Sequence, residues 1–118
     1  MNMTNNYTYN AKLLKVIDGD TIDAMIDLGF DIWTKKRIRL YGLNAPETRT
    51  TDTEEKDRGL HSKERLNALM DEYGGLFTIK SHGVEKYGRC LGELWVGEEK
   101  INVNELLLRE GLAVPYMV

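Results

Sequence analysis

The sequence predicts an α+β fold in which five short strands form a partly open Greek-key barrel and two helices pack against it. Strand-like and helix-like segments follow one another in the order of three strands, one helix, two strands and one helix. The strand segments alternate apolar and polar residues, whereas the helical segments repeat apolar residues at three- and four-residue spacing. Turns rich in glycine separate the segments. Their lengths fit a small barrel without choosing among barrel types.

The first three strands are expected to form a meander. Residues 9–17 have a strand-like mixture of apolar and polar side chains, and Asp18-Gly19-Asp20 is a turn of the kind that joins hairpin strands. Apolar and polar residues alternate cleanly over residues 21–27. A longer turn over residues 28–34 then leads into a third strand, which contains Arg39.

The first helix is expected from near Thr53 to about Tyr73, where Gly74-Gly75 ends it. Asn102 is a suitable cap for the second helix, and Gly111 closes that helix. The buried side of the first helix should carry Leu66, Leu69, Met70 and Tyr73. The remaining strands are expected at residues 76–80 and 90–96, with a loop over residues 82–88.

The composition is that of one globular domain, predicted over residues 9–118 behind a loose arm at residues 1–8. The chain has 118 residues, of which 42% are hydrophobic and 30% charged. Its lone cysteine, Cys90, excludes an internal disulfide and a cysteine-based zinc site. No apolar run approaches the ~20 residues that span a bilayer, so no membrane partner is expected. No signal peptide is visible, which predicts a cytoplasmic protein.

The charge of the chain argues against general attraction to phosphate backbones. The net charge is −3 and the pI is about 5.4. A local basic cluster nevertheless exists, because Lys35, Lys36, Arg37 and Arg39 fall within five positions. Such a cluster acts within a Debye length of ~8–10 Å. Its alternative interpretation is a solvated edge strand.

Three acidic residues are candidates for a site. Asp18 and Asp20 flank a glycine, so both carboxylates can project from one turn toward a hard cation. Glu47 ends a turn that Pro46 stiffens. Aspartate and glycine are also common in ordinary turns, and Glu47 can equally be a surface acid.

Two arginines are candidates for holding a phosphate. Guanidinium groups match phosphate geometry through paired hydrogen bonds and keep their charge, which suits Arg39 and Arg89. Lys86 and Tyr87 precede Arg89 and offer a second cation and a face on which a base can stack. The alternative for Arg89 is a surface salt bridge with Glu85 or Glu93.

Four stretches occur in an order that resembles the staphylococcal nuclease, or thermonuclease, family. They are VIDGDT at residues 16–21, RLYGLNAPET at residues 39–48, KYGR at residues 86–89 and NELLLREGLA at residues 104–113. The resemblance covers most of the chain from about Ala11 to Tyr116. It implies an OB-fold barrel with packed helices and Ca²⁺-dependent hydrolysis of DNA and RNA phosphodiesters, which leaves 5′-hydroxyl and 3′-phosphate ends.

The resemblance also assigns roles to individual residues. It makes Glu47 the acid that orients or deprotonates the attacking water, and Arg39 and Arg89 the phosphate clamps. It makes Asp20, Asn44 and the backbone carbonyl of Ala45 the Ca²⁺ ligands. It places Lys86, Tyr87 and Tyr116 beside the bound nucleic acid.

The chain departs from the family pattern in two places. The family has an aspartate where this chain has Asn44, so one negative charge is missing from the implied metal site and weaker Ca²⁺ binding is expected. The sequence also ends at Val118, without the further C-terminal helix of the family's best-known member. We expect this to lower stability or to leave apolar surface for a homodimer partner.

The sequence therefore supports two functional hypotheses. The first is an endonuclease with little sequence specificity that cuts DNA or RNA and prefers single strands, because one phosphate must enter a concave site. The second is a catalytically weak or inactive nuclease-like domain that binds nucleic acid or a protein partner. Asn44 and the acidic net charge favour the second, whereas the presence of Asp20, Arg39, Glu47 and Arg89 favours the first.

Overall fold

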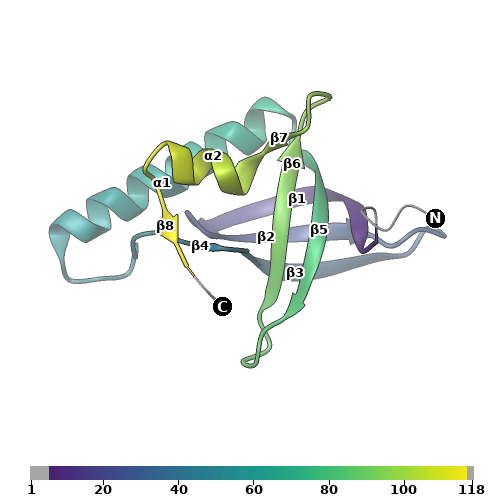
Figure 1. The fold of residues 1–118 in the computed structure, drawn as a ribbon, viewed down its shortest axis with the longest axis horizontal. Coiled ribbons are helices and arrows are strands. Elements are labelled where there is room, and N and C mark those ends of the chain that lie inside the picture. The colour runs from purple at the N-terminus through teal and green to yellow at the C-terminus, as the bar shows by residue number, and fades with distance from the viewer. Residues whose placement is uncertain (1–5, 117–118) are drawn as a thin grey trace.

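The computed structural model describes residues 6–116, and in this part of the chain a strand barrel packs against two helices (Figure 1). The elements in chain order are β1 (Thr8–Asp18), β2 (Thr21–Asp27), β3 (Trp33–Leu40), β4 (Leu43–Asn44), α1 (Thr53–Glu72), β5 (Leu76–Val84), β6 (Cys90–Val96), β7 (Ile101–Asn102), α2 (Val103–Arg109) and β8 (Val114–Pro115).

The barrel is a mixed sheet closed on itself. Strand β1 lies between β2 and β5, β3 pairs with β2, and β6 pairs with β5, all antiparallel. A parallel pairing of β3 with β6, in which Arg39 lies opposite Leu91, joins the two ends. Five strands thus form a closed barrel, which confirms the predicted α+β fold of the OB type.

The predicted alternation in β2 and β3 sorts residues between the barrel interior and its outer face. Ile22 and Ala24 are fully buried, and Ile38 on the neighbouring strand is nearly so. The residues between them on each strand point outward, among them Arg37 and Arg39. The strand that carries the predicted phosphate clamp is therefore fixed in register by the core behind it.

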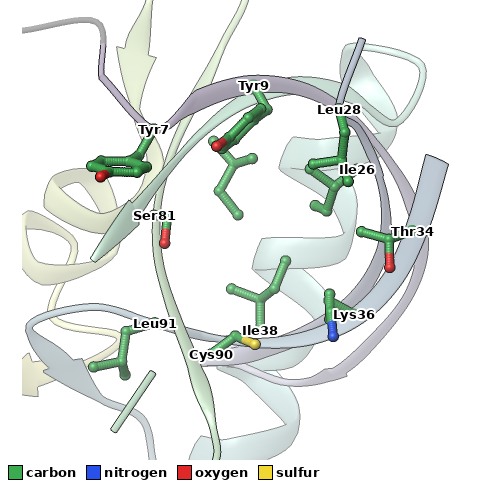
Figure 2. Close-up of a pocket in the computed structure, with 11 residues that line it drawn as sticks. Tyr7, Tyr9, Ile26, Leu28, Thr34, Lys36, Ile38, Ser81, Cys90 and Leu91 are labelled. Carbon is green, nitrogen blue, oxygen red and sulfur yellow. The ribbon is translucent and has the colours of Figure 1, made fainter. Parts of the chain in front are cut away.

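Helix α1 begins and ends as its sequence predicts. The carboxylate of Asp52 accepts hydrogen bonds from the backbone N–H groups of Glu54 and Glu55, and Gly74 and Gly75 take positive φ angles after the last turn. Its buried side carries Leu66, Leu69 and Met70. In the view down the barrel of Figure 2, α1 lies behind the interior, so it covers one end of the barrel.

Helix α2 packs beside the barrel and ties it to α1. Asn102 caps the helix by accepting from the backbone N–H of Glu105, and Val103 and Leu107 are fully buried. After α2 the chain returns to α1, where the Ser62 hydroxyl donates to the carbonyl of Leu112 at 2.7 Å. This contact directs the C-terminal segment toward the short strand that follows β3, where β8 pairs with β4.

The structure corrects the predicted loop at residues 82–88. Strand β5 continues to Val84, which lies opposite Cys90 after a register shift. The prediction ended this strand at Lys80 because Ser81, His82 and Gly83 lack the expected apolar alternation. Strands β4, β7 and β8 were also missed, since two residues are too few to show a period.

The first five residues of the predicted N-terminal arm lie outside the described residues, and β1 begins at Thr8. Neither α1 nor α2 combines the length and the apolar composition that a bilayer-crossing helix requires.

Candidate active site

The turn between β1 and β2 places one buried carboxylate at the end of the barrel. Asp20 is only 6% exposed. One of its oxygens accepts from the Thr21 hydroxyl at 2.8 Å, and the other accepts from the backbone N–H of Ala45 at 2.9 Å. The Asp20 side chain thus joins the first hairpin to the turn that follows β4. A buried carboxylate needs such donors, because burial without hydrogen bonds disfavours its charge.

The guanidinium of Arg39 fills the space between Asp20 and β4. Its side chain is 10% exposed. Nη1 lies 3.2 Å from the second Asp20 oxygen, and Nη2 donates to the side-chain oxygen of Asn44 at 2.7 Å and to the carbonyl of Leu43 at 3.2 Å. Arg39 therefore contacts both side chains that the resemblance assigns to the metal.

The C-terminal segment supplies an aromatic wall beside Arg39. Strand β8 pairs with β4, so that Asn44 lies opposite Val114, and the backbone N–H of Tyr116 donates to the carbonyl of Gly42 at 2.9 Å. The Arg39 guanidinium lies 5.2 Å from the centre of the Tyr116 ring. A residue 77 positions away in sequence is thus brought against the clamp by a two-residue strand pair.

The turn that carries Glu47 rests on helix α1. The Glu47 backbone N–H donates to the Glu55 carboxylate at 3.4 Å, and the Thr48 hydroxyl donates to Asp18. The Glu47 side chain is exposed and has no hydrogen-bond or ion-pair partner within residues 6–116. Its carboxylate is therefore free to accept a proton or to hold a water molecule.

Gly59 permits the close approach of this turn to α1. A Cβ atom at Gly59 would lie 2.6 Å from the carbonyl oxygen of Glu47 and 2.8 Å from that of Pro46. Both neighbours are backbone atoms, so the helix accepts only glycine here without a shift of the turn.

Glu85 organises the loop before β6. Its carboxylate accepts from the backbone N–H groups of Tyr87 and Arg89 and from the Arg89 guanidinium, each at 3.0 Å. The hydrogen bond from Arg89 lowers the pKa of Glu85. Glu85 in turn raises the pKa of Arg89, with smaller contributions from Tyr116 and Asp20, so Arg89 lies within electrostatic reach of both. The Arg89 side chain remains 50% exposed.

Lys86 and Tyr87 lie at the exposed tip of the same loop. The Lys86 ammonium lies 5.1 Å from the centre of the Tyr87 ring, and Tyr87 is 75% exposed. Both side chains are available to a ligand that approaches Arg89.

The donor types at Asp20 and Asn44 fit a hard divalent cation. A carboxylate and an amide oxygen lie on the two sides of the Arg39 guanidinium, and the Ala45 backbone adjoins them. The charge fits less well, since Asp20 is the one anionic side chain in this set and Arg39 already bonds to it. Within residues 6–116 no group of three or more His, Cys, Asp and Glu side chains is placed to hold a metal.

Two cavities help to place the site. One of about 330 Å³ adjoins Asn44 and Ala45 and extends to Glu55 and Arg58 on α1. Another, of about 210 Å³, is mostly apolar, lies at the mouth of the barrel and contains Cys90 (Figure 2). None of the predicted site residues lines the second cavity, so it is separate from the candidate site.

The structure brings together Asp20, Arg39, Asn44, Ala45 and Tyr116, with Arg89 in electrostatic range. It places Glu47, Lys86 and Tyr87 at the exposed rim. Sequence reasoning missed Glu55 and Gly59, which support the Glu47 turn. Nothing in a local pattern identifies Gly59, because glycine inside a helix usually indicates only reduced helix propensity.

We predict that Gly59→Ala destabilises the protein by about 1–3 kcal/mol, the usual cost of overpacking. Alanine normally favours a helix interior over glycine by ~1 kcal/mol, so the contact with the turn reverses the expected sign. Denaturant unfolding measures the difference. As a control, the exposed Ala68 of the same helix should lose stability when changed to glycine. A stabilised Gly59→Ala would contradict the close approach.

We also predict that Arg89→Ala raises the pKa of the Glu85 carboxyl toward its ordinary value of 4.5. Because the folded-state pKa of Glu85 is lowered, the Glu85–Arg89 ion pair stabilises the fold at pH values above the ordinary pKa of the carboxyl. This stabilisation is lost as the pH falls through the lowered pKa. A carboxyl-detected NMR titration of both proteins measures the shift. An unchanged Glu85 titration would show that Arg89 does not contact Glu85 in solution.

Comparison with known proteins identifies the family. The family model described as staphylococcal nuclease homologue matches residues 37–118. The thermonuclease of Staphylococcus intermedius is 34% identical over 84% of this chain and 55% of that protein. The thermonuclease of Staphylococcus hyicus is 30% identical over 92% of this chain and 59% of that protein. Protein ParB of Escherichia coli is 31% identical over 90% of this chain and 56% of that protein.

The chain thus spans between half and two thirds of the length of these relatives. The matched region contains every candidate site residue except Asp20, namely Arg39, Asn44, Ala45, Glu47, Lys86, Tyr87, Arg89 and Tyr116. The chain belongs to the family of staphylococcal nuclease homologues.

Proposed function

We propose that this protein is an endonuclease that hydrolyses DNA or RNA phosphodiesters with little sequence specificity. The observation that carries the proposal is the position of Arg39, a largely buried guanidinium between Asp20 and Asn44 with Tyr116 beside it. Arg89 and Glu47 complete the set at the rim. The names of two relatives, both thermonucleases, support the same activity.

Arg39 and Arg89 bind the phosphoryl group that reacts. Each holds a carboxylate in the free protein, Asp20 for Arg39 and Glu85 for Arg89, so each is oriented for an oxyanion before the substrate arrives. Fixed guanidinium groups stabilise charge that increases in the transition state without reorganising, which is usually the largest contribution to catalysis. No base edge is read in this arrangement, which accounts for low sequence specificity.

Glu47 activates the water. Its exposed carboxylate accepts a proton from a water molecule whose oxygen attacks phosphorus, and the bond from phosphorus to the 5′ oxygen breaks. The products are a 3′-phosphate and a 5′-hydroxyl, with the leaving oxygen taking its proton from solvent. Pro46, Glu55 and Gly59 keep the Glu47 backbone in place during this step.

Asp20, Asn44 and the backbone carbonyl of Ala45 would hold a Ca²⁺ ion. Bound there, such an ion would supply positive charge to the reacting phosphate. The chain itself contributes one carboxylate and one amide, so binding is weak compared with a site of two carboxylates. With Asp20 holding the ion, Arg39 would be released from Asp20, and the substrate phosphate would replace the carboxylate as the partner of Arg39.

A single-stranded substrate fits the site best. Tyr116 and Tyr87 present ring faces on which unpaired bases can stack, and stacking is worth about 1–3 kcal/mol per base. Tyr87 is 75% exposed in the loop that carries Arg89, and Tyr116 is 41% exposed and lies within electrostatic reach of Arg89.

A second candidate function is binding of nucleic acid or a protein partner without cutting. The 2.7 Å hydrogen bond from Arg39 to Asn44 favours it, since a guanidinium here competes with the cation for the amide oxygen. The two functions differ in whether the wild-type protein cuts or whether cutting requires the substitution Asn44→Asp.

We predict that the wild-type protein cuts denatured DNA in millimolar Ca²⁺ and that Glu47→Gln lowers the rate by about 10²–10⁴-fold, the usual contribution of a general base. Product length on a denaturing gel measures the rate, and a chelator should abolish it. The matched control is Glu98→Gln, at an exposed turn outside the site. Equal activity of wild type and Glu47→Gln would exclude Glu47 as the base.

We predict that Asn44→Asp binds Ca²⁺ about tenfold more tightly, a difference of ~1.4 kcal/mol, because it restores a charged ligand. Calorimetric titration measures the affinity, and Asn67→Asp on the exposed side of α1 is the control. An inactive wild type with an active Asn44→Asp would support the non-cutting function. If neither protein binds Ca²⁺, the assignment of the metal ligands is wrong.

A further inference from the structure

The outer face of strands β1, β2 and β3 extends away from Arg39 along the barrel. Side chains two positions apart on a strand share a face, so Arg39 is followed on β3 by Arg37, Lys35 and Trp33. The strand register places Lys12 and Lys35 on the two sides of Met25, one row across the sheet.

A β-bulge in β1 adds a further lysine to this face. The register shifts between Leu13 and Lys15, so that Lys12 and Lys15 both face outward although three positions separate them. Lys15 then lies opposite Asp23, whose other neighbour is Arg37. The bulge therefore adds Lys15 to a face that already carries Lys12, Lys35 and Arg37.

The face carries more cations than acids. Its charged residues are Lys12, Lys15, Lys35, Arg37 and Arg39 against Asp18, Asp23 and Asp27. Asp23 is occupied by Arg37 through bonds of 2.8 and 3.1 Å, and its pKa is lowered by this pairing and, to a smaller extent, by Lys35 and Lys15. A chain of net charge −3 thus carries a locally positive face next to its candidate site.

A cavity of about 420 Å³ lies at the far end of this face. Its lining includes the two tryptophans of the chain, Trp33 and Trp95. Lys12 lies 5.3 Å from the centre of the Trp33 ring, and Asp27 and Asn10 add hydrogen-bonding groups. The cavity therefore combines aromatic surface, a cation and polar groups, which is what a planar heterocycle attached to a phosphate requires.

We propose that this face binds the single strand that continues from the phosphate held at Arg39, with an unstacked base in the cavity between Trp33 and Trp95. The inference rests on the proposed function and specifies the path of its substrate. Arg39 and Trp33 are six positions apart on β3, which is about 20 Å at ~3.3 Å per residue. At the ~3.4 Å per nucleotide of one B-DNA strand this path holds about six nucleotides, within the ~4–16 that one OB-fold barrel binds.

The features of this face favour a nucleic acid strand over other polymers. Lys12, Lys15 and Lys35 are exposed and lie in two neighbouring rows of the sheet, Lys15 with Arg37 and Lys12 with Lys35, so they can contact neighbouring phosphates of a strand that runs along β3. Duplex DNA cannot deliver a base into the cavity without unpairing it, which selects single strands. An acidic peptide would use the lysines but would gain nothing from the two indole rings.

The first experiment measures binding with a chelator present, so that no strand is cut. A labelled oligothymidylate of about 12 nucleotides is titrated by fluorescence anisotropy over a range of salt concentrations. Each lysine that neutralises a phosphate contributes about 0.7 to the slope of log affinity against log salt, so Lys12→Ala with Lys35→Ala should lower the slope by about 1.4. An unchanged slope would overturn the proposal.

Lys36→Ala is the matched control for Lys35→Ala. The two lysines are neighbours on β3, but Lys36 lines the mouth of the barrel, on the opposite face of the strand (Figure 2). We expect Lys36→Ala to leave the salt slope unchanged. An equal effect of the two substitutions would mean that net charge alone controls binding, and that the face makes no particular contribution.

The second experiment uses the tryptophans as reporters of the cavity. Since both line it, oligothymidylate should quench the intrinsic fluorescence, and Trp33→Leu should remove part of that quenching and weaken binding severalfold. Polyglutamate serves as the competing polymer. Quenching by polyglutamate equal to that by oligothymidylate would overturn the assignment to nucleic acid.

Cleavage assays separate this inference from the proposed function. Binding with the predicted salt slope but without cleavage in Ca²⁺ would leave the inference standing and the endonuclease proposal wrong. Cleavage that is lowered by Glu47→Gln, together with a salt slope that Lys12→Ala and Lys35→Ala leave unchanged, would support the endonuclease proposal and overturn the inference about this face.

Discussion

The parallel pairing of β3 with β6 is the constraint on which the rest of this molecule depends. It closes the barrel and places Arg39 opposite Leu91, two residues after Arg89. Asn104 holds the junction, since its buried amide donates to the carbonyls of Tyr41 and Gly92 and accepts from the backbone N–H of Leu94. Parallel strands need a long connection, and here it contains α1 and β5. Two arginines that are 50 positions apart thus reach one site because the sheet closes.

Arg39 determines the electrostatic balance of the site. Its guanidinium bonds to Asp20 and Asn44 in the free protein, so a cation held by these two side chains and a phosphate held by Arg39 would not bind independently of each other. If Asp20 held a cation, Arg39 would lose this carboxylate as a partner, and a substrate phosphate could replace it. Asn44 accepts a hydrogen bond from Arg39 but adds no negative charge, so it would favour a bound cation less than an aspartate would. Substrate and cation should therefore assist each other's binding, and the reciprocity of linked binding requires the effect to be mutual.

The sequence predicted the fold class and most element positions because strong local patterns specify them. The alternation in β2 fixes the barrel interior, and Asp52, Gly74 and Gly75 mark the ends of α1. It could not predict contacts that depend on tertiary structure. Strands β4 and β8 are two residues long, too short to be recognised from sequence, and only their pairing in the fold brings Tyr116 to Arg39. Gly59 is likewise explained only by the turn that approaches it, 12 residues earlier at Glu47.

The basic cluster at residues 35–39 shows most clearly where sequence proximity misleads. Four cations within five positions look like one surface, but a strand divides neighbouring residues between its two faces. Lys36 turns to the barrel mouth, whereas Lys35 and Arg37 join Arg39 on the outside. The outer face gains further positive charge from a different strand, because β1 carries Lys12 and, after its bulge, Lys15 on the same side. Positive charge near the site is thus a property of the sheet register, and substitutions that shift the bulge would change it without removing a single lysine.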